Sequence, residues 1–104
     1  IQGLGFALTE ELVIEDGHIL NAHFGAYKVP SIEDLPVLET VLVPSDGGLI
    51  PHAGKAIREV ANCPVAPAIA NAVFDAARVR IASLPITAEK VYWAMSAAES
   101  TQTN

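Results

Sequence analysis

A two-residue turn signal is the feature that most constrains how this chain can fold. Asp16-Gly17 separates two apolar runs, Leu12-Val13-Ile14-Glu15 and His18-Ile19-Leu20-Asn21. An Asp-Gly pair suits the positive φ angles of a type I′ turn, which joins two antiparallel strands. The sequence therefore predicts a β-hairpin over residues 12–21.

A third strand is predicted at residues 37–43. This run is rich in β-branched side chains and is bounded by Pro36 and Pro44. Side chains of this kind favour the pleated surface of a sheet. We expect the run to pair with the hairpin, because a two-stranded hairpin alone is marginally stable in water.

An N-terminal helix is predicted over residues 3–12, where Leu4, Leu8 and Leu12 recur on one face. Gly3 and Gly5 weaken its first turn by about 1 kcal/mol each relative to alanine. Two such small residues also permit the close approach of another backbone segment.

Two C-terminal helices are predicted, over residues 62–77 and 88–97. Asn62 is the expected N-cap of the first, and Pro64 falls in its first turn, where a missing N–H costs little. Thr87 is the expected cap of the second. The expected buried face of the first helix comprises Val65, Ile69, Ala72, Val73 and Ala76.

The predicted fold class is α+β, with one domain over residues 1–97 and a disordered tail over residues 98–104. A small antiparallel sheet, formed by the hairpin plus one strand, packs with the N-terminal helix and the two C-terminal helices. Residues 44–61 form a long connection, which in a small domain is usually functional or mobile.

Composition excludes several classes of protein. The chain is 51% hydrophobic, which excludes intrinsic disorder. Six basic and twelve acidic side chains give a net charge of −6 without a basic run, so no nucleic-acid partner is expected. No apolar stretch approaches the roughly 20 residues that cross a bilayer, so no membrane partner is expected.

The start of the chain and its one cysteine bear on where the protein works. We expect no signal peptide, and the first residue, Ile1, suggests a processed chain or part of something longer. Cys63 has no second cysteine for an internal disulfide. This favours a reducing compartment, the cytoplasm.

The residues alone offer little chemistry. His18, His23 and His52 have no cysteine or carboxylate at metal-ligand spacing, so we interpret them as surface histidines and predict no metal site. Cys63 is interpreted as a small buried hydrophobe at a helix start. The acidic cluster around the hairpin is interpreted as a solvated face: Glu10, Glu11, Glu15 and Asp16.

Glu59 stands apart because it lies in the long connection, about three residues ahead of the predicted helix. A carboxylate there can stabilise the helix dipole or simply be exposed. It can also be a general base presented on a loop. Both interpretations are open on the residues alone.

Three segments resemble one known family. Residues 2–11 read QGLGFALTEE and resemble the QG(I/L)G.AL.EE segment of the xanthine dehydrogenase / aldehyde oxidase family, the molybdenum hydroxylases. Residues 55–73, KAIREVANCPVAPAIANAV, are similar to the family's KG(V/I)GE…PVAPAIANA segment, and residues 84–91 to its LP(I/L)T.E.V ending. The resemblance covers residues 1 to about 95 in the family's order and spacing.

The resemblance implies the C-terminal part of a molybdopterin-binding large subunit. Glu59 falls on the family's general-base glutamate, which activates Mo–OH for hydroxylation of an electron-poor carbon. Gln2 falls on a glutamine near the pterin. The implied cofactor is molybdopterin in the intact enzyme, with none expected on this chain alone. The implied partners are the remainder of the molybdenum-binding subunit and iron–sulfur and flavin subunits or domains.

The chain departs from the family pattern at three glycines. Ala56 and Arg58 replace glycines beside Glu59, and Arg78 replaces a glycine common at that helix end, where a left-handed residue is expected. An arginine next to the expected base can pair with it and fill substrate space. These departures leave alternatives open: a split subunit, an excised segment, or a non-catalytic remnant that acts as an interaction module.

Self-association of the isolated chain is also predicted. The alanine-rich helix at residues 62–77 is apolar nearly all the way round, and such a helix is normally buried. We expect a two-fold dimer through this helix, unless the 44–61 connection covers it.

Overall fold

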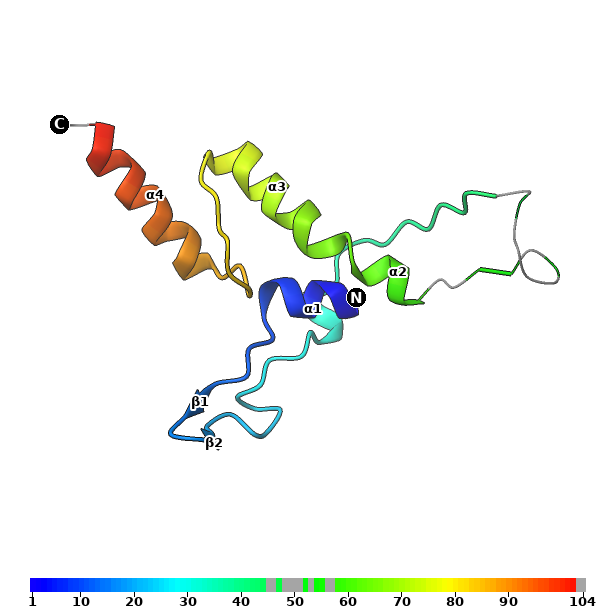
Figure 1. Cartoon of the computed structure of the whole chain (residues 1–104), viewed down its shortest axis with the longest axis horizontal. Helices are drawn as coiled ribbons and strands as arrows, with labels where there is room; N and C mark the ends of the chain where they lie inside the picture. The colour runs from blue at the N-terminus through cyan, green and yellow to red at the C-terminus, as the bar shows by residue number, and fades with distance from the viewer. Residues whose placement is uncertain (45–46, 48–51, 53, 56–57, 103–104) are drawn as a thin grey trace.

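The computed structural model describes residues 1–44, 47, 52, 54–55 and 58–102 of the chain. In chain order its elements are α1 (Gln2–Leu8), β1 (Ile14–Glu15), β2 (His18–Ile19), the 3-10 helix η1 (Ile32–Asp34), α2 (Arg58–Asn62), α3 (Val65–Ala77) and α4 (Ala88–Gln102). The hairpin lies at the lower edge of the molecule in Figure 1, below the helices. The α+β class is confirmed.

The hairpin forms where the sequence predicts it. Ile14 pairs with Ile19 and Glu15 with His18 in an antiparallel ladder. Asp16 and Gly17 adopt φ angles of 49° and 77°, the two positive values that a type I′ turn requires.

Two hydrogen bonds of the Asn21 side chain close the open end of the hairpin. The Asn21 amide donates to the carbonyl oxygen of Glu11 at 2.6 Å and accepts the Val13 N–H at 2.9 Å. One side chain therefore joins the two arms where the ladder ends.

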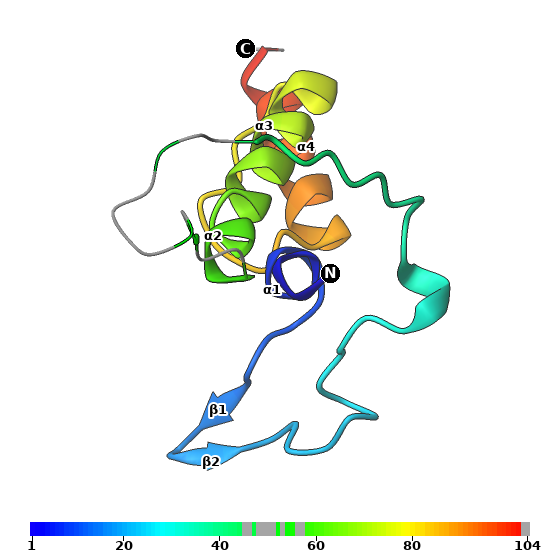
Figure 2. The ribbon, with the colours of Figure 1, turned by 90° about the vertical axis from the view of Figure 1, so that its right-hand side faces the viewer.

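The prediction of a third strand at residues 37–43 is wrong within the described part of the chain. The segment is extended but unpaired, and it leaves α1 on the side opposite to the hairpin (Figures 1 and 2). The η1 turn diverts it: the Asp34 carboxylate accepts the backbone N–H and the hydroxyl of Ser31, both at 2.7 Å. Strand-forming side chains do not make a strand without a neighbouring edge.

The N-terminal helix is shorter than predicted, because α1 ends at Leu8 rather than near Leu12. The N–H groups of Thr9 and Glu10 both donate to the Gly5 carbonyl oxygen at 2.9 Å. This closes the last turn and releases the chain toward the hairpin. Leu12 is consequently half-exposed and takes no part in the helix.

The small residues of α1 allow the predicted close approach. Gly3 is buried, and a Cβ atom built on it would lie 2.8 Å from the Cγ2 of Val65 and 3.2 Å from the Asn62 carbonyl oxygen. Any larger side chain would hold α1 away from α2 and from the start of α3. Figure 2 views α1 nearly end-on, beside these two helices.

The predicted helix over 62–77 is two helices. Asn62 is the last residue of α2 rather than an N-cap, and Pro64 immediately precedes α3. Proline lacks an N–H, and its ring clashes with the preceding turn, so a continuous helix cannot pass through it. None of the α3 residues is fully buried. Of the predicted buried face, Val65, Ile69 and Val73 are half-buried, whereas Ala72 and Ala76 are exposed.

The left-handed end of α3 agrees with the expectation from the family pattern. Arg78 has a φ angle of 58°, and its N–H donates to the Phe74 carbonyl oxygen at 2.8 Å. The chain then turns back toward α1. There the N–H of Ile86 donates to the Ala7 carbonyl oxygen at 2.6 Å.

The last helix begins where predicted and runs further. The Thr87 hydroxyl accepts the Lys90 N–H at 3.2 Å, which confirms the cap. α4 continues to Gln102, so residues 98–102 are helical rather than the disordered tail that the sequence predicts. Residues 103–104 lie outside the described part.

Little of the chain is buried. Among the described apolar side chains, Ala7, Val79 and Ile86 form the core. The radius of gyration is 18.2 Å, whereas a compact domain of this length has about 13 Å. The accessible surface is 8593 Å², against about 5,600 Å² for a compact monomer of this mass, an excess of about 3,000 Å².

Candidate functional site

Gln2 and Glu59 lie on two helices that touch. Gln2 opens α1 and is exposed. Glu59 is the second residue of α2, in its first turn, and is also exposed, rather than lying in a loop ahead of the helix as predicted. The two helices meet where buried Gly3 faces the Asn62 carbonyl oxygen. The glycine contact therefore brings the two candidate residues to neighbouring elements.

The functional groups of Gln2 and Glu59 are available for binding. In the part of the chain that the structure describes, neither the Gln2 amide nor the Glu59 carboxylate makes a hydrogen bond or an ion pair. An amide offers two donors and an acceptor, and a carboxylate offers acceptors only. The Gln2 amide is therefore available to bind a polar group, and the Glu59 carboxylate is available to accept a hydrogen bond or a proton.

The turn after α2 is fixed by a cysteine. The Cys63 thiol donates to the Glu59 carbonyl oxygen at 3.5 Å. Cys63 is exposed, so its predicted burial is wrong. The break at Pro64 explains this, because it ends α2 there and leaves Cys63 between two helices rather than inside one.

The departures from the family pattern fall at two places. Arg58 begins α2 directly before Glu59, and Ala56 lies outside the described residues. Arg78 sits far along the chain at the end of α3, where its guanidinium is 3.8 Å from the Asp75 carboxylate. Both of these groups are largely exposed, and such pairs contribute little to stability.

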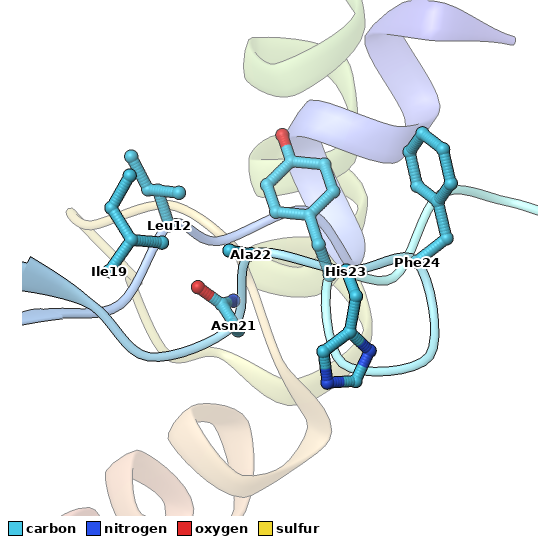
Figure 3. Close-up of a pocket in the computed structure, with 7 residues that line it drawn as sticks. Leu12, Ile19, Asn21, Ala22, His23 and Phe24 are labelled. Carbon is cyan, nitrogen blue, oxygen red and sulfur yellow. The ribbon is translucent and has the colours of Figure 1, made fainter.

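A separate pocket lies beside the hairpin, and the sequence does not predict it. It has a volume of about 300 Å³ and is lined by Leu12, Ile19, Asn21, Ala22, His23, Phe24 and Tyr27. Figure 3 shows Leu12 and Ile19 side by side, with His23 and Phe24 pointing in opposite directions. Its lining is mostly apolar. Periodicity could not reveal it, because its walls come from both the hairpin and the turn that follows it, rather than from one face of a single element.

A tyrosine ties this pocket to the end of α1. The Tyr27 hydroxyl donates to the Glu10 carboxylate at 2.8 Å. That hydrogen bond, with smaller contributions from desolvation and from the charge of Glu10, raises the pKa of Tyr27 above its ordinary 10.0. The hydrogen bond connects the segment between β2 and η1 to the residues that follow α1.

The described residues offer no metal site of their own, since no group of three histidine, cysteine or carboxylate side chains gathers there. His18 contacts its own turn, with Nδ1 3.0 Å from the Asp16 carbonyl oxygen. Nor does any described helix have the length and apolar character to cross a bilayer.

Comparison with known proteins decides the family. Residues 1–36 match the family described as "Molybdopterin cofactor-binding domain". Over 92 residues the chain is 37% identical to the aldehyde oxidoreductase molybdenum-binding subunit PaoC of Escherichia coli, covering 86% of this chain and 13% of that protein. It is 38% identical over 92 residues to the putative xanthine dehydrogenase molybdenum-binding subunit XdhA of the same organism, covering 86% and 12%.

The chain belongs to the xanthine dehydrogenase and aldehyde oxidase family. A further relative, the probable hypoxanthine oxidase XdhD of Escherichia coli, is 34% identical over 97 residues, covering 91% of this chain and 10% of that protein. The chain thus spans about an eighth or less of the length of these curated relatives.

The residues present fit a share of a molybdopterin site. The unpaired Gln2 amide suits the polar edge of a pterin, and the Glu59 carboxylate suits a proton acceptor. Both residues are exposed. One amide and one carboxylate are too few to enclose a cofactor, because binding sites bury most of their ligand's surface. The family match supports a molybdopterin cofactor in the intact enzyme.

Proposed function

We propose that this chain supplies the catalytic-base wall of a molybdenum hydroxylase, with Glu59 as the general base and Gln2 as a pterin-binding residue. The observation that carries the proposal is the contact between α1 and α2, which brings the two uncommitted side chains to adjoining elements. The bound cofactor would supply the redox chemistry. The rest of its binding site would come from the remainder of the molybdenum-binding subunit.

The work of Glu59 is proton transfer. Its carboxylate accepts a proton from the hydroxyl group that attacks the electron-poor carbon of the substrate. General bases of this kind contribute about 10²–10⁴-fold in rate. Gln2 holds the pterin by its amide and so fixes where the reacting atoms stand relative to Glu59.

Partners follow from the same proposal. Several relatives are named as subunits of larger dehydrogenases, for example the 6-hydroxypseudooxynicotine dehydrogenase complex subunit gamma of Paenarthrobacter nicotinovorans. We therefore propose that the chain works in an assembly with iron–sulfur and flavin subunits or domains, which would receive the electrons.

The test is Glu59→Gln in the assembled oxidoreductase. We expect kcat to fall by about 10²–10⁴-fold. The free energy of unfolding should change by at most about 1 kcal/mol, because Glu59 contacts only the helix dipole. Glu89→Gln is the matched control, since Glu89 is also an exposed acid in the first turn of a helix. Full activity in the Glu59 variant would contradict the proposed role.

A second candidate function is a non-catalytic interaction module, and the large exposed surface favours it. Arg58 separates the two candidates, because the family has glycine at this position. If the site is catalytic but impaired, Arg58→Gly in the assembled enzyme should raise kcat. If both Arg58→Gly and Glu59→Gln leave the assembly intact and turnover unchanged, the interaction module is the better description.

A further inference from the structure

Among the described residues, 37–43 form the most exposed apolar run. The exposed fractions of its side chains are 100% for Val37, 61% for Leu38, 74% for Val41, 76% for Leu42 and 87% for Val43. Alternate residues of an extended segment point to opposite faces. Apolar side chains therefore project on both faces, in the pattern of a strand covered by other layers on both sides.

The backbone of the segment is also unsatisfied. Within the described residues, none of its N–H or C=O groups makes a hydrogen bond. It runs extended from η1, clear of every helix except near its start (Figure 1). The hairpin cannot pair with it, because β1 and β2 are two residues long and lie on the other side of α1.

We infer that residues 37–43 add as a strand to an open sheet edge in the remainder of the molybdenum-binding subunit. The identity of the partner in this inference, the remainder of the subunit, rests on the proposed function. Strand addition supplies main-chain hydrogen bonds along the segment, and pockets for alternate side chains give specificity. An edge strand beneath covering layers satisfies both the backbone and the two apolar faces.

The occupant is the subunit rather than a second copy of this chain. Two copies paired edge to edge would leave both apolar faces of a two-stranded ribbon in water, and such a ribbon is marginally stable. The relatives are about seven to nine times longer than this chain, so proteins of this family contain further chain that would cover the segment. The chain as a whole exposes about 3,000 Å² more than a compact monomer of its mass, and the 37–43 segment is one part of that uncovered surface.

Amide hydrogen exchange tests the inference, with the assembled oxidoreductase compared with the isolated chain. In the assembly the bonded amides of residues 37–43 should exchange at least about tenfold more slowly, because they gain hydrogen bonds. Exchange at the free-chain rate in the assembly overturns the inference. So does equal protection in the isolated chain at high concentration, which would identify a second copy as the occupant.

Two neighbouring proline variants make the test specific to strand pairing. In an edge strand, successive N–H groups point alternately toward and away from the sheet, and proline removes one N–H. Of Val41→Pro and Leu42→Pro, one should lose the protection of the segment in the assembly and the other should keep it. The isolated chain provides no bonds at either position, so neither variant alters its own fold. Equal behaviour of the two variants contradicts pairing at an edge.

The outcomes separate docking from catalysis. If residues 37–43 are protected but the Glu59→Gln variant is active, the proposed general base is contradicted and the strand addition is supported. If the variant is inactive but the segment is not protected, the general base is supported and the strand addition is contradicted. Recovery of the tagged chain from its host without any other part of a molybdenum-binding subunit overturns the docking inference.

Discussion

Replacing Gly3 by alanine tests whether a missing side chain sets the distance between α1 and its neighbours. A Cβ atom at this position would lie 2.8 Å from the Cγ2 of Val65, 2.9 Å from its Cβ and 3.2 Å from the Asn62 carbonyl oxygen. Favourable carbon contacts need about 3.5–4.0 Å. The Cβ of Val65 and the carbonyl oxygen cannot rotate away, so α1 must move.

Two opposing contributions set the free-energy change caused by Gly3→Ala. Alanine stabilises a helix by about 1 kcal/mol relative to glycine. Overpacking of a close contact costs about 1–3 kcal/mol. The net result is a loss of about 1 kcal/mol in the local free energy of opening of α1, which corresponds to roughly fivefold faster amide exchange in that helix.

The assay is residue-resolved hydrogen exchange of α1 and α3, with two comparison variants. Gln2→Ala changes an exposed residue of the same helix and should stay within about 0.5 kcal/mol. Val65→Ala removes the nearest methyl group, and in combination with Gly3→Ala it should recover at least about 0.5 kcal/mol, as expected for residues in contact. Slower exchange in Gly3→Ala would refute the reasoning, because it would mean that helix propensity outweighs the clash.

Three further predictions concern single contacts. Alkaline titration by ultraviolet absorbance should give Tyr27 a pKa above 10.0, with a return toward 10.0 in Glu10→Gln. Because the folded-state pKa is raised, the stabilisation from this contact should be present below about pH 10 and disappear as the pH rises through the folded-state value. Thr87→Ala should destabilise α4 by about 1 kcal/mol in thermal unfolding, and Thr87→Ser should not. Arg78→Gly should stabilise the end of α3 by about 1 kcal/mol in the same assay, since a left-handed φ of 58° is costly for any residue with a Cβ.

Local signals in the sequence predict three features of the structure correctly, and neighbouring residues decide each of them. Asp16-Gly17 fixes the hairpin because both of its φ angles are positive, and Thr87 fixes the start of α4 through one hydrogen bond. The left-handed Arg78 likewise follows from its position at a helix end. In each case the deciding interaction spans at most about four residues.

The predicted strand pairing at 37–43 and the predicted burial of an α3 face, which both need a distant partner, are wrong. The run at 37–43 has the side chains of a strand, but η1 carries it away from the hairpin. The apolar character of α3 indicates a buried face, yet no α3 residue is fully buried. Hydrophobic periodicity predicts which face of a segment is apolar, but it does not predict which other part of the protein packs against that face.

The candidate site shows the same division. Glu59 and Gln2 are found through family motifs, because composition and spacing leave Glu59 open between a helix cap and a base. Their placement on touching helices depends on Gly3, a contact across about sixty positions of the sequence. Spacing rules cannot supply such a contact. The pocket at the hairpin escapes prediction for a related reason, since its lining combines hairpin residues with the turn that follows them.

The small contact around α1 makes the arrangement of the site depend on assembly. Gly3, Ala7 and Ile86 hold α1 against its neighbours, while the hairpin, the 37–43 segment and α4 extend outward from it (Figure 1). A contact this small opens easily, and anything that binds only the closed form stabilises it. Docking of the exposed segments onto the remainder of the subunit would therefore also hold α1 against α2. In that way the surface that anchors the chain and the two residues proposed for chemistry would be coupled, although they lie on different parts of the fold.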